Sequence, residues 1–403
     1  MAIQSGYPIG INKAARSKKL MKPLVSVIIP AYNHADFLPT CIESISRQSD
    51  GMVEIIVVDD GSTDNTEEVV NNFRNIKYNK QSNSGPSVAR NRGLAIAEGR
   101  FVAFLDADDI WLGGFLATLL PVLENCNENI ALVACGWRYI DIRGDRIGAD
   151  VLVEPQRFNW RSMILGNPLT VSSALCRLET IQKVGGFDPA IKGVEDWYLW
   201  LKLIDAGHQF ASVAESLVGY RIVKTGISHN VQGMFENTMR LLDRVFTELD
   251  PPKDVINLRA QSIAYRYLDG SAGYYQNHLD AKAESFFQQG VAVWPELLKD
   301  AHTVYTLVCA RQPKGYKLSG EFLELRDAEQ RVKGLLVEFS NQYPTYVKTG
   351  IGNLYMVLAR LAHVQKKYGM ARQFASQAIV ADPRQQGLNF LRTWTKSLLS
   401  KES

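Results

Sequence analysis

The first third of the chain alternates short runs of valine, isoleucine and leucine with longer amphipathic stretches. The apolar runs have the length of strands, and the stretches between them repeat apolar residues at helical spacing. The predicted strands are residues 24–31, 53–60 and 101–108, and the predicted helices are residues 37–48, 66–73, 86–99 and 114–126. Near-continuous apolar strands joined by helices are typical of a mostly parallel sheet with helices on both faces. The pattern therefore predicts an α/β fold for residues 24 to about 138.

The pattern changes further along the chain. Residues 139–220 continue the α/β pattern, with strand-like runs at 170–177 and 215–222 and a helical stretch at 195–207. From about residue 235 the periodicity is helical, with few strand signals. The expected parts are a basic disordered leader at 1–22, a Rossmann-like α/β domain at 23–234 and an all-α C-terminal domain at 235–403.

Two stretches of the helical region repeat small and aromatic residues at the spacing of tetratricopeptide-type helix pairs. The first contains Tyr267, Tyr274, Ala283, Phe287, Gly290 and Pro295, and the second contains Tyr355, Leu358, Ala359, Ala371, Ala378 and Pro383. The two stretches are not separated by a whole number of repeats. A helical repeat and a generic helical bundle therefore stay equally open.

Composition places the chain among globular proteins. Its 403 residues suit two domains, and hydrophobic residues make up 46% and charged residues 22% of them. A net charge of +3 provides no electrostatic footprint for nucleic acid, so no nucleic-acid partner is expected. The five cysteines are scattered and lack zinc-ligand spacing, so we expect them to be reduced and mostly packed. They are Cys41, Cys126, Cys135, Cys176 and Cys309.

The first 22 residues carry five cations and no acid, namely Lys13, Arg16, Lys18, Lys19 and Lys22. The apolar run that follows, residues 24–29, is far shorter than the core of a signal peptide or membrane helix. We therefore expect a cytoplasmic protein. Peripheral contact of the cations with the inner face of a membrane is the alternative to a solvated leader.

Polar residues gather where the predicted strands end, and ligands of parallel sheets bind outside the carboxyl ends of strands. Residues 30–34, 59–64 and 106–109 occupy such positions. In the last of these, Asp106, Asp108 and Asp109 repel one another and need an offsetting cation. A hard divalent ion that bridges phosphate oxygens uses few protein carboxylates. The motif therefore predicts a Mg²⁺ or Mn²⁺ site, with a solvated acidic loop as the alternative.

Two further acidic pairs suggest chemistry. Asp59 and Asp60 end a neighbouring strand, where Asp60 could accept a hydrogen bond from the imide of a uracil or thymine base or from a ribose hydroxyl. Glu195 and Asp196 begin a predicted helix, and acids are favoured there by the helix dipole, which lowers their pKa. Burial against Trp197 would raise that pKa, and a carboxylate beside such a wall can act as a general base.

Four segments, in this order and spacing, resemble the large family of inverting glycosyltransferases called family 2. They read VSVIIPAYNHADFLPTCIESISRQ, EIIVVDDGSTDNT, GPSVARNRGLAIAEGRFVAFLDADDIW and GGFDPAIKGVEDWYLWLKL. The resemblance covers residues 23–225 and implies a GT-A fold. It further implies metal-dependent transfer of a sugar from a nucleotide-diphosphate donor, with a UDP-sugar favoured, to a hydroxyl of a glycan, lipid-linked or protein acceptor. Polysaccharide or glycoconjugate biosynthesis is the implied setting.

The resemblance also implies roles for residues at matching positions. The nucleotide-sugar would be bound by Pro30, Ala31, Tyr32, Asp59, Asp60, Arg90, Asn91 and Asp106. The Mg²⁺ or Mn²⁺ would be bound by Asp106, Asp108 and Asp109, and the catalytic base would be Asp196. Arg90 could equally be a structural ion-pair partner. Relatives often have a histidine soon after a Tyr-Arg pair, whereas here it is delayed to His229, whose role stays open.

Two other classes of function compete with this interpretation. A nucleotidyltransferase would also use metal-binding aspartates, but it usually has a Gly-rich, basic phosphate loop after the first strand, and residues 30–37 are neither. A non-catalytic scaffold would bind a protein partner through the helical domain and keep only a vestigial transferase domain. The presence of Asp60, Asp108 and Asp196 argues against the scaffold. For an active transferase, we expect the helices to place the acceptor or a partner.

Overall fold

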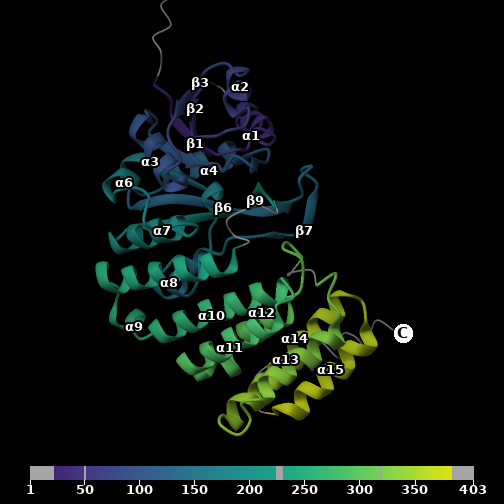
Figure 1. Ribbon diagram of the computed structural model, residues 1–403. Coiled ribbons are helices and arrows are strands. Elements are labelled where there is room, and N and C mark those ends of the chain that lie inside the picture. Colours follow the sequence, from purple (N-terminus) through teal and green to yellow (C-terminus); the bar gives the residue numbers. More distant parts are fainter. Residues whose placement is uncertain (1–21, 50, 224–229, 317–319, 384–403) are drawn as a thin grey trace, which may run out of the picture.

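A computed structural model describes residues 22–49, 51–223, 230–316 and 320–383 of the chain. Figure 1 shows an elongated molecule with a sheet and its helices at one end and the C-terminal helices at the other. Helices α7 (Glu195–Asp205) and α8 (Val231–Glu248) lie where the two parts meet. The observed order of elements confirms an α/β part followed by an all-α part.

The strands form one mixed sheet in the described part of the chain. They are β1 (Val25–Ala31), β2 (Val53–Asp59), β3 (Ile76–Lys80), β4 (Phe101–Phe104), β5 (Ile110–Trp111), β6 (Ile130–Ile140), β7 (Arg146–Val151), β8 (Ala174–Arg177) and β9 (Gln209–Arg221). Their order is β3-β2-β1-β4-β8-β6-β9-β5, and β7 pairs with β6. The first four strands in this order pair in parallel, β8 is antiparallel to β4 and β6, and β6 is parallel to β9.

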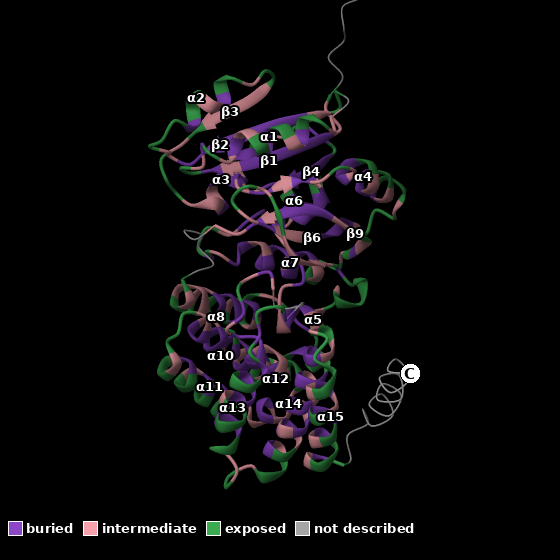
Figure 2. Cartoon of the chain, turned by 90° about the vertical axis from the view of Figure 1, so that its right-hand side faces the viewer, coloured by how far each residue is buried: buried purple, intermediate pink, exposed green. Residues whose placement is uncertain are grey.

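Alternate residues of the central strands enter two different cores. Ile28 and Phe104 belong to one core, whereas Val27, Ile29 and Phe101 belong to the other. Successive side chains of a strand point to opposite faces, so this alternation means that helices cover both faces. The first core contains residues of α3 (Pro86–Ile96), α6 (Leu178–Lys183) and α7, and the second contains residues of α1 (Leu38–Ser46), α2 (Thr66–Asn71) and α4 (Phe115–Asn125). Figure 2 shows these strands as the buried centre of the upper part.

The elements predicted from the pattern are present, with shifted ends. The strand that starts at Phe101 ends at Phe104, so the acids at 106–109 lie in the loop after it. Strands β3, β6 and β7 were not among the predicted elements. Strand β3 has the sequence IKYNK and is only partly buried, so it lacks the apolar run that signals a parallel strand. The antiparallel pairings of β8 are set by contacts distant in sequence.

The C-terminal part consists of helices with a core of their own. Besides α8 they are α9 (Lys253–Ile256), α10 (Arg259–Gln276), α11 (Asp280–Val293), α12 (Ala301–Val308), α13 (Leu325–Val337), α14 (Pro344–Val364) and α15 (Tyr368–Ala381). The small residues of the two repeat-like stretches lie in the pairs α10–α11 and α14–α15, where Ala283, Ala371 and Ala378 are buried. A tetratricopeptide repeat stays a prediction.

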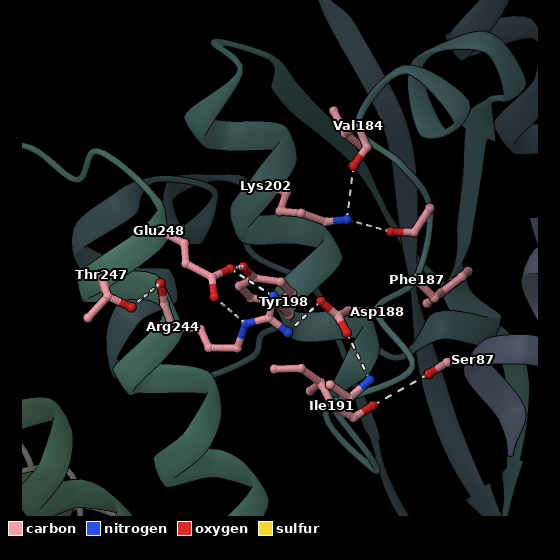
Figure 3. A network of polar contacts seen from close by, with 12 residues as sticks. Ser87, Val184, Phe187, Asp188, Ile191, Tyr198, Lys202, Arg244, Thr247 and Glu248 are labelled. Carbon is pink, nitrogen blue, oxygen red and sulfur yellow. Dashed lines mark hydrogen bonds and ion pairs between the residues drawn. The ribbon is translucent and has the colours of Figure 1, made fainter.

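Helix α8 packs against the α/β part as well as against the other helices. Leu241, Leu242 and Val245 join the same core as the sheet face that α7 covers. Figure 3 shows Arg244 of α8 contacting Asp188, in the loop before α7, and the carboxylate of Glu248. A domain boundary at residues 234/235 stays a prediction, and this packing favours a later one.

Four of the five cysteines are buried, and each of the five is free of a disulfide bond. This agrees with the expectation of reduced, packed thiols. Within the described residues, every helix is too short or too polar to cross a membrane.

Candidate active site

Asp59 is the last residue of β2 and is fully buried. Its carboxylate accepts hydrogen bonds from the Tyr78 hydroxyl at 2.6 Å and from the backbone N–H of Ser62 at 2.7 Å. Burial alone would raise the pKa of Asp59, but these hydrogen bonds to the ionised form lower it. Asp59 is therefore an ionised residue that holds the loop after β2.

Asp60 follows Asp59 and is also buried. Its carboxylate accepts hydrogen bonds from the Gln81 side chain at 2.7 Å, the Ser84 backbone at 2.8 Å and the Gly85 backbone at 2.7 Å. Asp60 thus fastens the segment that leads into α3. Its reading of a nucleobase stays a prediction.

The three aspartates after β4 differ in their surroundings. Asp109 is buried, and its carboxylate accepts hydrogen bonds from the Ser172 hydroxyl at 2.7 Å and the Arg221 backbone at 2.9 Å. Burial, together with the charges of Asp108 and Asp106, raises the pKa of Asp109 well above its ordinary value. Burial and the charge of Asp106 also raise the pKa of Asp108. The repulsion expected from the sequence is therefore present.

Arg221 is a site residue that the sequence reasoning did not assign. It is buried at the end of β9, and its guanidinium donates to the Asp108 carbonyl oxygen at 2.7 Å. It also donates to the carbonyl oxygens of Asp141 and Ile142, so it holds the acidic loop against the end of β6. The Tyr-Arg pair in the sequence was the signal, but its partner lies 113 residues away.

Arg90 of α3 bridges two acidic segments. Its guanidinium donates to Asp106 at 2.6 Å and to Glu195 at 2.7 Å, and Arg90 and Glu195 are both buried. Burial alone would lower the pKa of Arg90, but the two carboxylates raise it. The second oxygen of Glu195, Oε2, is buried without a hydrogen-bond partner in the described structure. The ion-pair role that the sequence left open for Arg90 is therefore present.

Asp196 is half-buried in the first turn of α7. Its carboxylate accepts hydrogen bonds from the Trp197 backbone at 2.7 Å and from the Asn167 side chain at 3.1 Å. Burial, and secondarily the charge of Glu195, raises the pKa of Asp196 to about 7. Of the two opposing effects weighed from the sequence, burial dominates over helix-terminal placement.

A cavity of about 620 Å³ lies beside Asp196, and Asp59, Asp60, Asp108 and Asp109 are not among the residues that line it. Arg90, Asp106, Glu195 and Asp196 line one side of it, and residues of α8 and α10 line another. The cavity therefore places Asp196 next to the Arg90–Asp106 pair, with helices of the C-terminal part facing them.

Several predicted site residues do not line this cavity. Pro30, Ala31 and Tyr32 end β1 and begin its loop, where Tyr32 is exposed. Asn91 uses its side-chain amide to donate to and accept from the Phe187 backbone, at 2.7 and 2.9 Å. Nucleotide contacts by these four residues stay predictions, and His229 lies outside the described residues.

Comparison with known proteins gives the family. The model of the family "Glycosyl transferase family 2" matches residues 26–167. A putative teichuronic acid biosynthesis glycosyltransferase, TuaG of Bacillus subtilis, is 31% identical over 215 residues, which are 52% of this chain and 83% of that protein. The chain belongs to glycosyl transferase family 2. It is a glycosyltransferase.

One further relative and one solved structure are also similar to the chain. WfaP of Escherichia coli, named a UDP-Glc:α-D-GlcNAc-diphosphoundecaprenol β-1,3-glucosyltransferase, is 29% identical over 51% of this chain and 80% of its own length. The crystal structure of TarS residues 1–349 from S. aureus with UDP-GlcNAc has 17% identity and a TM-score of 0.49, over 87% of this chain and 92% of that one. The likeness to both curated relatives is limited to about half of this transferase.

The donor set after β4 fits a divalent ion. Carboxylate oxygens are the ligands that Mg²⁺ and Mn²⁺ prefer, and burial, together with the charges of neighbouring aspartates, raises the pKa of Asp108 and Asp109. In the described residues, no group of three or more His, Cys, Asp or Glu side chains is arranged to hold a metal alone. A site of this kind suits an ion that takes its remaining ligands from diphosphate and water.

Proposed function

We propose that this transferase moves a sugar from a UDP-sugar to a hydroxyl of its acceptor and inverts the anomeric configuration, with Asp196 as the general base. One observation carries the proposal. Asp196 lines the cavity beside Asp106 and has a pKa raised to about 7, where a carboxyl group accepts and holds protons near neutral pH.

Neighbouring residues support this role of Asp196. The Asn167 amide and the Trp197 backbone N–H hold its two carboxylate oxygens, so the group has a defined direction. Asp196 would take the proton of the acceptor hydroxyl as that oxygen bonds to the anomeric carbon. The bond from the anomeric carbon to the diphosphate breaks on the opposite side, and the diphosphate leaves with the electron pair.

Asp106 and Asp108 would hold a Mg²⁺ or Mn²⁺, which when bound neutralises charge that develops on the departing diphosphate. Arg90 fixes one oxygen of Asp106 in an ion pair and so sets the direction of the carboxylate. Asp109 is engaged with Ser172 and the Arg221 backbone, which favours a supporting role for it in the loop.

Support for the donor and the setting comes from relatives. The name of the Escherichia coli relative specifies UDP-glucose and a lipid-diphosphate-linked acceptor, and that of the Bacillus subtilis relative specifies teichuronic acid. The resemblance to the family implies that Asp60 would read the nucleobase. We therefore place this transferase in polysaccharide or lipid-linked glycan biosynthesis, at the cytoplasmic face of the membrane.

The test compares Asp196→Asn with Asp205→Asn, a matched change at the exposed far end of α7. Both variants should bind UDP as the unchanged protein does in calorimetry with Mn²⁺. Transfer from UDP-glucose or UDP-GlcNAc should fall by about 10²–10⁴-fold in Asp196→Asn only, because a positioned base contributes that much.

Three results would contradict the proposal. Undiminished transfer by Asp196→Asn would mean that Asp196 is not the base, and Glu195 would be the next candidate. Equal UDP affinity with Mn²⁺ and with EDTA would remove the proposed metal role of Asp106 and Asp108. A protein that binds UDP but transfers no sugar from any donor would be the vestigial scaffold.

A further inference from the structure

The cavity beside Asp196 has one wall that the family's motifs do not supply. Met234 and Phe235 of α8 and Arg266, Asp269 and Gly270 of α10 line it. These residues lie beyond residue 225, where the stretch that resembles the family ends, and beyond residues 26–167, which the family model matches. The helical wall is therefore a feature of this chain's C-terminal part, and it faces the proposed base.

Arg266 joins this wall to α7, the helix that carries Asp196. It is buried, and its guanidinium donates to the Leu165 carbonyl oxygen at 2.6 Å. The guanidinium carbon lies 4.9 Å from the ring centre of Trp197, the residue after Asp196. The Trp197 indole in turn donates to the Met163 carbonyl oxygen at 2.7 Å. Arg266 thus keeps α10 at a fixed place relative to Asp196.

Asp269 lies one turn after Arg266 in α10 and forms an ion pair with it. Asp269 is the exposed partner of this pair. Its Oδ2 lies 3.2 Å from Arg266, and 57% of its side chain is exposed. Within the described residues, its Oδ1 has no hydrogen-bond partner. Asp269 therefore presents a fixed, ionic acceptor to the cavity, suited to the hydroxyl groups of a ligand.

Phe235 provides an apolar surface next to this acceptor. Its ring is half-buried and is held by Tyr267 and Phe286, with ring centres 4.9 and 5.0 Å away. Gly270 permits this arrangement, because a Cβ at residue 270 would lie 2.5 Å from the Phe286 ring. An aromatic face beside a carboxylate matches a sugar, which has an apolar C–H face and hydroxyls at its edge.

The charges around the cavity favour an uncharged sugar. Four carboxyl groups and three guanidinium groups line it, so it has no excess of positive charge for a phosphate or carboxylate. The two buried guanidinium groups, those of Arg90 and Arg266, are already paired with carboxylates.

We propose that α8 and α10 form the acceptor site, in which Asp269 binds hydroxyls of a neutral acceptor sugar, Phe235 contacts its apolar face, and Arg266 positions both Asp269 and Trp197. The inference rests on the proposed function, because it needs Asp196 as the base. It assigns acceptor selection to the helical part of the chain.

The test uses the full chain, UDP-glucose and UDP-GlcNAc as donors, and p-nitrophenyl glycosides as acceptor probes. Asp269→Ala should raise the KM for a neutral glycoside about tenfold, since it removes hydrogen bonds to a charged group. UDP affinity should stay unchanged. The matched control is Asp243→Ala, an exposed acid on α8 that pairs with Arg259.

A second pair of variants tests the positioning role. Arg266→Lys should lower kcat as well as raise the acceptor KM, because Trp197 beside Asp196 loses its planar partner. Arg259→Lys is the control, since Arg259 lies on the same helix, pairs with an aspartate and lies 5.1 Å from the Phe246 ring centre.

Acceptor probes that differ in charge test whether the acceptor sugar is neutral. The unchanged protein should prefer p-nitrophenyl β-glucoside to p-nitrophenyl β-glucuronide, and Asp269→Asn should narrow that preference. A preference for the glucuronide, an unchanged KM in Asp269→Ala, or no transfer to any glycoside despite donor hydrolysis would overturn the inference. Absence of UDP binding and donor hydrolysis in the unchanged protein would instead contradict the proposed function.

Discussion

The two walls of the cavity around Asp196 hold their charges in different ways. On the sheet side, Arg90 contacts Asp106 and Glu195 at 2.6 and 2.7 Å, and Arg90 and Glu195 are almost completely buried. On the helical side, the pair of Arg266 and Asp269 is longer, at 3.2 Å, and its acid is more than half exposed. The charges on the sheet side are thus mostly buried and paired, although one oxygen of Glu195 has no hydrogen-bond partner in the described structure, whereas the acid on the helical side is exposed.

This difference suggests how the two walls divide the work. A buried network holds its groups in one arrangement, which suits a donor site with the same chemistry throughout a family. An exposed carboxylate on a helix can be exchanged with little cost to stability, which suits a site that selects among acceptors. The family model matches residues 26–167, which include Arg90 and Asp106 but neither Glu195 and Asp196 nor the helical wall.

Truncation of the chain is the strongest test of the comparison between the two walls. A chain that ends at residue 234 loses Leu241, Leu242, Val245 and Val255, which are buried in the core of the sheet face. Each such side chain contributes about 1.5–3 kcal/mol on burial, so the loss rivals the total stability of about 5–15 kcal/mol. We expect this chain to be unfolded in circular dichroism.

The matched cut, after residue 258, keeps α8 and α9 and removes the wall formed by α10. This chain should fold and bind UDP but lose transfer to glycosides, because the proposed acceptor site is incomplete. A folded, UDP-binding chain ending at residue 234 would support the domain boundary expected from the sequence. It would also show that α8 is dispensable for the sheet.

The second prediction concerns the sheet wall alone. Arg90→Met should lower the free energy of unfolding by about 3–5 kcal/mol, because it leaves Glu195 charged, buried and unpaired. The matched change, Arg259→Met, breaks an exposed pair and should cost about 0–1 kcal/mol. Urea unfolding of both variants measures the difference.

A double variant separates charge from packing. Adding Glu195→Gln to Arg90→Met removes the stranded charge and should recover part of the lost stability. No recovery would mean that Arg90 acts mainly through its contact with the Phe187 ring, whose centre lies 5.3 Å from the guanidinium. Equal losses in Arg90→Met and Arg259→Met would contradict the contrast between a buried and an exposed ion pair.

The sequence placed the acids at the strand ends more readily than the neighbours of Asp196, and the reason is physical. Asp59, Asp60 and Asp106 each follow an apolar run, and parallel strands bring their carboxyl ends to one edge, so local pattern and topology were enough. The neighbours of Asp196 could not be found this way. Asn167 lies 29 residues before it in the chain, and Arg266 reaches the site through a contact with Leu165 across 101 residues.

The sequence also left two questions open, namely the direction of the pKa shift of Asp196 and the role of Arg90. It described Asp196 both as an acid at a helix start and as a carboxyl beside tryptophans, which shift its pKa in opposite directions. Only the folded arrangement, with Glu195 beside it and the cavity in front, decides that burial dominates. Likewise, the ion-pair role of Arg90 stayed open until Glu195, 105 residues away, was placed against it, and a contact of Arg90 with the nucleotide stays a prediction.

The last prediction uses the pKa of Asp196 to sharpen the contrast between its two neighbours, Glu195 and Asn167. The base must be ionised, so transfer should rise with pH through about 7 and be about tenfold lower at pH 6 than at pH 8. Glu195→Gln should move this profile to lower pH, because it removes a charge that raises the pKa. Asn167→Ala should move it to higher pH, because it removes a hydrogen bond to the ionised form.

Stability provides an independent check of the same group. The folded pKa of Asp196 lies above the ordinary value, so the folded state binds the extra proton between about pH 4 and pH 7. Ionisation therefore lowers the stability of the unchanged protein as pH rises through that window, and the effect is constant above it. Asp196→Asn cannot ionise, so its stability relative to the unchanged protein should increase from pH 4 to pH 7. A stability difference between the two proteins that does not vary with pH, together with a flat rate profile in that range, would contradict the raised pKa. It would mean that the carboxyl group of Asp196 titrates at its ordinary pKa.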